Sequence, residues 1–338
     1  MLFFQRLFAK TRLLPSSSAF NNRATVDDVI AAYRLILRRQ PDAAGFAHYQ
    51  QRVDKGLTLE QLHSEFTNSH EYLHHIANEH EIQEVDLGGY SVCVRYAEKD
   101  FGQSLIETRQ YEPHVCQALK NILKPGDTFV DVGANIGCIS LLACTLVGTE
   151  GRVIALEPNP DNVQLLYAGI VLNKFTNIQV LPFAASNRRE ILSLQGGTSN
   201  TYLTQTKDYQ ANHAYAQTVL LDEALAHLDK IDVVKMDIEG HEPFALQGME
   251  KLLHRHRPIL VTEFNPRCLR DVEGMAAEIY AQQLLTYYHQ LQVLTPFGDD
   301  VIFTQVDDLL RYWQKRDEEI TRQQLLPPGL LHFDIVAT

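Results

Sequence analysis

After Thr25 the apolar residues recur every three or four positions, as on one face of an α-helix. Thr25 itself is of a type favoured at a helix N-cap, and this first run ends before Pro41. A second helix is expected over residues 43–53, and Thr58 begins a sequence that resembles a capping box opening a third. We therefore predict a small helical module over residues 25–83.

From about residue 86 the pattern changes to short apolar runs that alternate with helical stretches. This alternation is typical of a parallel sheet with helices on both faces. Five runs are expected to be parallel strands: residues 128–131, 151–156, 177–181, 231–237 and 258–263. Three later runs, residues 291–294, 300–304 and 331–336, supply an antiparallel end. The predicted fold class is α/β, with a mostly parallel sheet and an antiparallel last strand in a domain over residues 84–338.

One polar, glycine-containing stretch, residues 195–215, has no clear periodicity and is predicted to be a long surface loop. Loops above a ligand crevice commonly select the substrate. Five of its side chains are suited to hydrogen bonding or stacking on a sugar: Thr198, Asn200, Tyr202, His213 and Tyr215. The alternative is a solvated loop without ligand contacts.

The composition is that of an ordinary globular protein. Of 338 residues 45% are apolar, and no run of about 18 apolar residues suggests a membrane-spanning helix. The 30 basic and 42 acidic residues give a net charge of −12, which argues against a generic nucleic-acid partner. The 5 cysteines are widely spaced and indicate reduced thiols, so we expect a cytoplasmic protein.

The first residues differ from the remainder in charge. Residues 1–26 include Arg6, Lys10, Arg12 and Arg23 but no acidic residue. We expect residues 1–24 to form a flexible basic arm. Because apolar side chains are interspersed there, peripheral contact of residues 1–23 with a membrane is an alternative.

The segment after the first parallel strand carries the most informative motif. Asp131, Gly133 and Gly137 surround a tight turn before an apolar helix, and Glu157 ends the next strand. This is the layout of a nucleotide site, in which an acid at the second strand accepts hydrogen bonds from ribose hydroxyls. A dinucleotide fingerprint is absent, and Asp131 would repel a pyrophosphate. A cofactor with a cationic amino-acid end, such as S-adenosylmethionine (SAM), suits the turn better.

Three sequence segments carry a family resemblance: Asp131-Val-Gly-Ala-Asn-Ile-Gly137, Glu157-Pro-Asn-Pro160 and Val234-Lys-Met-Asp-Ile-Glu-Gly-His-Glu242. Together with the Arg257-Pro258 strand that ends at Glu263, they resemble the FkbM family of class I SAM-dependent methyltransferases, which have a Rossmann-like fold. The resemblance implies O-methylation of a hydroxyl on a polyketide, sugar or glycolipid. Residues 27–74 resemble a small helical module found beside glycan-modifying enzymes and in bacterial surface-associated proteins, which implies an interaction role.

The resemblance also implies roles by position. The turn around the methionine end of SAM corresponds to Asp131, Gly133, Ala134, Asn135 and Gly137. Glu157 corresponds to the ribose acceptor and Asn159 to its neighbour, while Ala184 and Ala185 begin the loop against adenine, which extends to Ser186.

The acidic residues after the fourth parallel strand are the candidates for catalysis. On an extended segment Asp237 and Glu239 would share one face at the strand's tip. Asp237 is the first candidate for the base that takes the acceptor's proton, with its pKa raised by Glu239 or with His241 sharing the task. Alternatively, Asp237, Glu239 and Glu263 hold a Mg²⁺ ion that acidifies the acceptor.

Other interpretations remain beside this one. In one of them Lys235 pairs with Asp237 or Glu239 in a purely structural role, and Glu242 caps the following helix. At the level of the whole protein, the alternatives are a non-catalytic scaffold that acts through its helical module and an aminopropyl transferase. A nicotinamide oxidoreductase would need the phosphate fingerprint that is absent. The acceptor and the oligomeric state stay open.

Overall fold

A computed structural model describes residues 22–37, 39–72, 81–95, 101–196, 201–205, 214–295 and 301–338. The chain divides into two compact units, residues 1–81 and 82–338. The predicted boundary after residue 83 falls inside strand β1 (Ile82–Asp86), which pairs antiparallel with β2 (Ser91–Arg95). Because β1 needs β2 as its partner, the second unit begins two residues earlier than expected.

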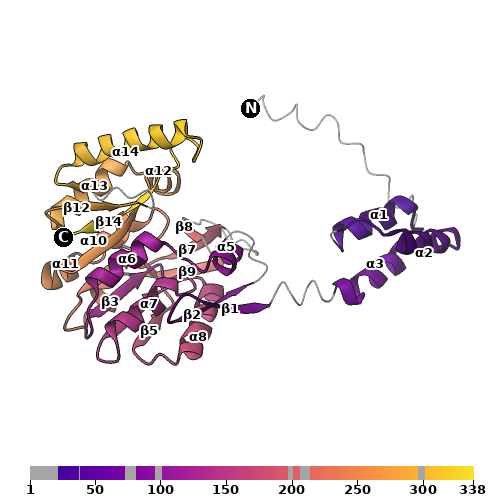
Figure 1. The fold of residues 1–338 in the computed structure, drawn as a ribbon, viewed down its shortest axis with the longest axis horizontal. Coiled ribbons are helices and arrows are strands. Elements are labelled where there is room, and N and C mark those ends of the chain that lie inside the picture. The colour runs from indigo at the N-terminus through magenta and orange to yellow at the C-terminus, as the bar shows by residue number, and fades with distance from the viewer. Residues whose placement is uncertain are drawn as a thin grey trace. The chain divides into compact units, whose positions relative to one another are not determined.

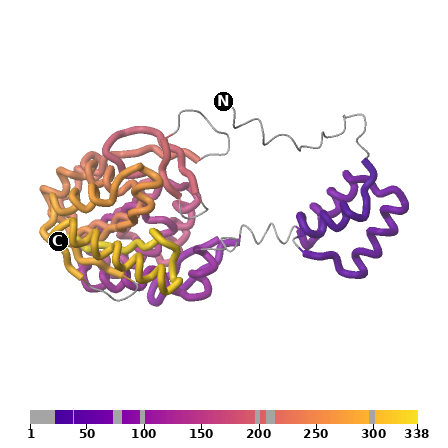
Figure 2. Tube along the Cα trace, turned by 90° about the horizontal axis from the view of Figure 1, so that it is seen from above, coloured from indigo at the N-terminus to yellow at the C-terminus, as the bar shows by residue number. Residues whose placement is uncertain are grey.

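The first unit contains the three predicted helices, α1 (Val26–Leu35), α2 (Ala43–Asp54) and α3 (Leu59–Thr67), shown in indigo in Figure 2. Capping boxes open α1 and α3. Their small core includes Tyr33 and Phe66, whose rings lie edge-on with their centroids 4.9 Å apart. Three predicted helices are therefore confirmed.

The end of the predicted basic arm is part of this unit. Residues 22–24 run antiparallel to residues 57–59: the Ala24 amide donates to Leu57 O and the Leu59 amide donates to Asn22 O, each at 2.8 Å. These bonds fix residues 22–24, which we had assigned to a flexible arm. Residues 1–21, with the predicted membrane contact, lie outside the described residues.

The second unit is built on an eight-stranded sheet (Figure 1), in the order β13-β12-β14-β11-β10-β3-β4-β5. Its strands are β3 (Thr128–Val132), β4 (Arg152–Leu156), β5 (Ile178–Leu181), β10 (Val233–Met236), β11 (Ile259–Phe264), β12 (Leu291–Leu294), β13 (Val301–Phe303) and β14 (Phe333–Ala337). Strands β3, β4, β5, β10 and β11 are parallel, whereas β14 lies antiparallel between β11 and β12. The predicted α/β class, with the strand arrangement of a class I methyltransferase fold, is confirmed.

Alternation of apolar side chains explains why both faces of this sheet are covered. Phe129 packs with one buried cluster and Val130, its neighbour in β3, packs with another on the opposite face. The Phe129 cluster includes residues of α6 (Pro113–Ile122) and α7 (Cys138–Val147). The Val130 cluster includes residues of α10 (Glu242–Gln247), α11 (Glu250–His256), α13 (Ala277–Tyr287) and α14 (Val306–Arg322). The other helices in the described ranges of the unit are α5 (Phe101–Thr108), α8 (Pro160–Asn173), α9 (Leu221–Ala224) and α12 (Pro266–Glu273).

Residues 195–215, predicted to form a long loop, are described only at 195–196, 201–205 and 214–215. All of these except residue 205 lie in strands of a second sheet, so the loop prediction is wrong for them. Residues 197–200 and 206–213 lie outside the described residues. Strands β6 (Ala184–Ala185), β7 (Ile191–Gly196), β8 (Thr201–Thr204) and β9 (Ala214–Val219) pair in the order β6-β9-β7-β8. Leu192, Leu194 and Leu203 belong to its small core, while alternate positions include polar Ser193, Gln195 and Thr204. Tyr202 and Tyr215 lie on strands, and Thr198, Asn200 and His213 lie outside the described residues.

Among the helices of the described ranges, none combines the length and apolar character needed to cross a membrane.

Candidate active site

The turn between β3 and α7 is held against the neighbouring strands. Gly133 and Gly137 have φ angles of +87° and +96°, a region that favours glycine. The amides of Gly133 and Ala134 both donate to Leu156 O, at 3.0 and 2.9 Å. A Cβ atom on Gly133 would overlap the carbonyl oxygen of Asp237. The turn therefore lies directly against the end of β10.

Glu157 ties this turn to the second parallel strand. Its Oε2 accepts from the Asn135 amide at 2.7 Å and its Oε1 from the Asn159 amide at 2.8 Å. Glu157 is 4% exposed, and this burial raises its pKa to about 7. Asn159 in turn caps α8, accepting from the Asp161 amide at 3.0 Å. The carboxyl group expected to bind ribose is thus fixed by backbone amides on both oxygens.

A cavity of about 290 Å³ lies at the carboxyl ends of the parallel strands. Five of the nine residues predicted to bind the cofactor line it: Gly133, Asn135, Glu157, Ala184 and Ala185. Asp237, Glu239 and Glu263 line the same cavity, which we call the crevice. Asp131, Ala134, Gly137 and Asn159 are not among the lining residues. The crevice thus joins the predicted cofactor site to the predicted acidic site.

Asp131 lies buried behind the crevice. Its Oδ2 accepts from Ser140 Oγ at 2.5 Å, and burial raises the pKa of its carboxyl group. Its register partner in β10 is Lys235, which is 2% exposed. Lys235 Nζ lies 3.1 Å from Asp237 Oδ2. Burial by itself would lower the pKa of Lys235, but the carboxylates of Asp237, Glu112 and Asp131 raise it overall, so the lysine is charged.

The predicted extended segment with Asp237 and Glu239 on one face does not form. Strand β10 ends at Met236, and Glu239 and Gly240 have φ angles of +55° and +102° in a turn. Glu242 closes this turn, because its Oε1 accepts from the amides of Ile238 at 2.8 Å and Gly240 at 3.2 Å. Burial, and then the Asp237 charge, raise the pKa of Glu239. Both acids reach the crevice through the turn rather than along a strand.

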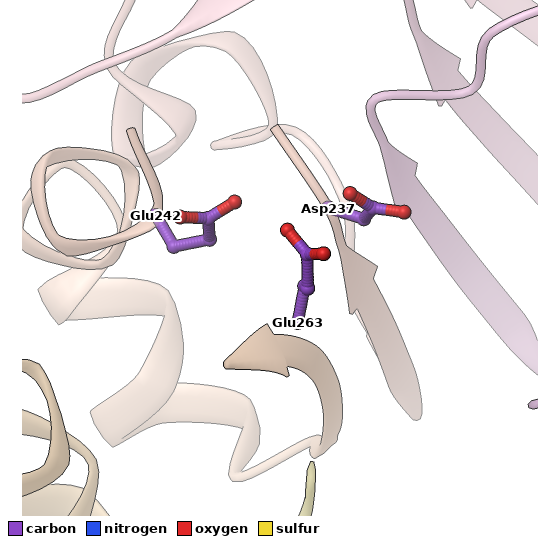
Figure 3. Close-up of side chains that lie close together, drawn as sticks. All are labelled: Asp237, Glu242 and Glu263. Carbon is purple, nitrogen blue, oxygen red and sulfur yellow. The ribbon is translucent and has the colours of Figure 1, made fainter. Parts of the chain in front are cut away.

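Three carboxyl groups meet beside this turn, at the ends of β10 and β11 and the start of α10 (Figure 3). One oxygen each of Asp237, Glu242 and Glu263 lies within 4.8 Å of the others. Glu239, which we had placed in the predicted Mg²⁺ set, is not in this group, and Glu242 takes its place. Burial is the main reason why the pKa of Glu242 is raised to about 8 and that of Glu263 well above its usual range. Protonation of the last two relieves the repulsion that three neighbouring charges would create.

His241 does not line the crevice. Its Nδ1 lies 2.5 Å from Glu273 Oε1, its Nε2 lies 3.0 Å from Ser186 Oγ, and the residue is 5% exposed. Because both ring nitrogens are engaged away from the crevice, His241 is not positioned for the proton transfer that we had considered for it. It connects the residue after β6 with helix α12 instead.

Sequence reasoning missed several lining residues, above all Glu112 and His332. Glu112 is the N-cap of α6 and has a left-handed φ of +36°. Burial raises its pKa to about 8. His332 immediately precedes β14. Because β14 runs antiparallel, its start lies at the same edge as the ends of the parallel strands, a signal that would have pointed to His332.

Comparisons with known proteins find similar methyltransferases. Residues 131–292 match the family model of the methyltransferase FkbM domain. The FkbM match begins at Asp131 in β3 and includes Glu157, the turn after β10 and Glu263.

Two curated relatives are methyltransferases. Protein-L-isoaspartate O-methyltransferase 1 of Arabidopsis thaliana is 28% identical over 109 residues, 32% of this chain and 44% of the relative. Hexuronic acid methyltransferase AglP of Haloferax volcanii is 28% identical over 153 residues, 44% of this chain and 61% of the relative. The chain therefore spans less than two thirds of either relative. Among solved structures, methyltransferase FkbM of Methylobacillus flagellatus is 19% identical, with a TM-score of 0.33, over 70% of this chain and 48% of that one.

Proposed function

We propose that this protein is a SAM-dependent O-methyltransferase that methylates a hydroxyl group of a sugar, glycolipid or polysaccharide. The observation that carries the proposal is the crevice, in which Glu157 and the Gly133 turn lie at one part and Asp237, Glu239 and Glu263 at another. The FkbM-domain match supports the cofactor, and the hexuronic acid methyltransferase among the relatives supports a glycan acceptor.

The chain's own residues bind the cofactor in this proposal. Glu157 accepts hydrogen bonds from the two ribose hydroxyls with the lone pairs that its bonds to Asn135 and Asn159 leave available. Ala184 and Ala185 line the crevice where adenine would lie. Buried Asp131 acts on the methionine end through the turn that it supports, since it does not itself line the cavity.

The reaction moves a methyl group and releases a proton. Bound SAM supplies a methyl group activated by its sulfonium; a new carbon–oxygen bond forms to the acceptor as the carbon–sulfur bond breaks. Asp237, which lines the crevice and is oriented by Lys235, accepts the hydroxyl proton. Glu239 lies beside it as a second carboxyl group. A bound Mg²⁺ held by Asp237, Glu242 and Glu263 is the alternative way to acidify the hydroxyl.

The experiment that tests the proposal is calorimetric titration of the full chain with S-adenosylhomocysteine (SAH), followed by transfer of labelled methyl to a panel of hydroxyl acceptors. Glu157→Ala should abolish SAH binding, whereas Glu150→Ala, on a loop outside the crevice, should not. Repeating the transfer with Mg²⁺ and with EDTA tests the metal alternative. Folded wild-type protein that fails to bind SAH would leave a non-catalytic scaffold. SAH binding without methyl on any oxygen would contradict O-methylation.

For the rest of the chain we propose a supporting role. The helical module, assigned to residues 25–83 from the sequence, acts as an interaction module that brings the enzyme to its acceptor. The five cysteines are free thiols, which supports a cytoplasmic location. Removal of residues 1–81 should then leave SAH affinity unchanged and weaken turnover of a polymeric acceptor more than that of a small one.

A further inference from the structure

A second, smaller cavity of about 140 Å³ adjoins the crevice. The two share four lining residues, Glu112, Asp237, Glu263 and His332. The smaller cavity therefore meets the crevice at its acidic part, away from Glu157 and the glycine turn. Its remaining lining comes from His114 and Asp334 and from apolar Leu326, Leu331 and Phe333.

Three residues that line this cavity also carry buried polar atoms without partners. In the described part of the chain, seven buried side-chain atoms have no hydrogen-bond partner. Three of them, Glu112 Oε2, His114 Nδ1 and Glu263 Oε2, belong to residues that line the smaller cavity. A buried polar atom that lacks a partner is costly, and such atoms commonly mark places where a ligand or water completes the bonding.

The charge of the lining restricts what the cavity accepts. Four of its residues carry carboxyl groups, and its described lining contains neither Lys nor Arg. Of its two histidines, His114 already places Nε2 2.9 Å from Asp334 Oδ2. Lys235 is charged, but its ammonium is buried against Asp237 and does not line the cavity. An anionic group would lie beside Asp237 and Asp334 with neither Lys nor Arg in the described lining, whereas hydroxyls can donate to these two carboxylates and to a histidine nitrogen.

Apolar side chains complete the match to a sugar. Leu326, Leu331 and Phe333 add apolar groups to a lining that also carries carboxyl groups. Pyranose rings likewise combine polar hydroxyls with apolar C–H faces. We propose that this cavity, called the acceptor cavity below, binds an uncharged hydroxyl-bearing sugar unit and discriminates against uronic acids. The inference rests on the proposed methyltransferase function and narrows its acceptor class.

Saturation-transfer NMR on the full chain loaded with SAH provides the test, with matched pairs of probes. Methyl β-glucoside is compared with methyl β-glucuronide, and the galactoside and mannoside with their uronides. The neutral member of at least one pair should bind. Its uronide should bind at least about tenfold more weakly, because its carboxylate would lie beside Asp237 and Asp334 without a lining Lys or Arg. Equal or tighter binding of the uronides, or binding of no neutral glycoside, overturns the proposal.

Neighbouring leucines supply a matched pair of variants. Leu326 lines the acceptor cavity, whereas Leu325 is 55% exposed and does not. Leu326→Trp should fill the cavity and weaken neutral-glycoside binding at least about tenfold with SAH affinity unchanged, and Leu325→Trp should change neither. Glycoside binding that Leu326→Trp leaves intact contradicts the assigned cavity. Loss of SAH binding in the wild type is the separate result that contradicts the methyltransferase function itself.

Discussion

The Lys235 ammonium lies 3.1 Å from Asp237 Oδ2 while Lys235 also stands in register with Asp131 across β3 and β10. The buried ammonium of Lys235 thus interacts with Asp131, behind the crevice, and with Asp237, which lines it. From the sequence, a structural Lys235–Asp237 pair is an alternative to a catalytic Asp237. The pair is present, and it is compatible with catalysis. Because the ion pair fixes Asp237, it positions the proposed base.

Lys235→Met tests how much the two acids depend on this cation. Removing one partner of a buried ion pair leaves an uncompensated charge, so we expect the free energy of unfolding to fall by about 3–5 kcal/mol. Lys230→Met is the control: Lys230 also pairs with an aspartate, Asp232, but its side chain is 57% exposed. That variant should lose less than about 1 kcal/mol. Urea denaturation measures both, and similar losses would show that the Lys235 pair contributes no more than a surface pair.

Gly133→Ala tests the close approach of the turn to β10. Gly133 and Gly126 have nearly the same φ, +87° and +88°, but a Cβ on Gly126 would meet no atom within 4 Å. Gly126→Ala should therefore lower the free energy of unfolding by about 1 kcal/mol through backbone strain alone. Gly133→Ala should lower the free energy of unfolding by at least about 2 kcal/mol more than Gly126→Ala, because its methyl group would displace the Asp237 carbonyl. It should also weaken SAH binding measured by calorimetry; a Gly133 variant as stable as the Gly126 variant would contradict the contact.

Much of this site could be predicted because it follows from local patterns in the amino-acid sequence. Short, buried, β-branched strands alternate with helices, and the rule that ligands bind at carboxyl ends of parallel strands brought Glu157, Asp237 and Glu263 to one place. The glycine turn was visible because its positive φ angles require residues that stand out in a sequence.

The missed features depend on tertiary structure. Strands β7 to β9 are short and have polar residues on alternate positions, so glycine and serine near their ends suggested a loop. Glu112 precedes a helix proline and carries no pattern of its own; only the packing of α6 brings it to the crevice. The turn at Glu239 was missed because a left-handed residue other than glycine is uncommon.

Glu157 should make SAH binding depend on pH. Its pKa of about 7 in the free protein means that it is partly protonated at neutral pH, whereas accepting two ribose hydroxyls favours the carboxylate. Affinity should therefore rise with pH and be about tenfold weaker at pH 6 than at pH 8, since each unit below the pKa costs about tenfold. Calorimetry at both pH values measures this. Glu157→Gln should bind weakly at both, and an equal pH effect in that variant would assign the proton to another group.

Glu112 should make the stability of the free protein depend on pH in the opposite sense to an ordinary carboxylate. Burial raises its folded-state pKa to about 8, so between the unfolded value of 4.5 and about 8 the native state binds the extra proton. Its contribution is fully present below pH 4.5 and is lost as pH rises through about 8. Glu112→Gln has no proton to lose at this position. Its free energy of unfolding, relative to that of the wild type, should therefore be at least about 1 kcal/mol higher at pH 9 than at pH 6.

Urea denaturation of the ligand-free protein at the two pH values measures this difference. Glu107→Gln is the control, because Glu107 is exposed on α5 and should track the wild type at both. Glu157 and Glu242 also have raised pKa values, so the wild-type slope should be reduced by Glu112→Gln and not abolished. A Glu112→Gln curve parallel to the wild-type curve would mean that Glu112 is ionised in the folded protein throughout this range. The carboxyl group would then depend on Lys235, whose charge lowers its pKa, more than on burial.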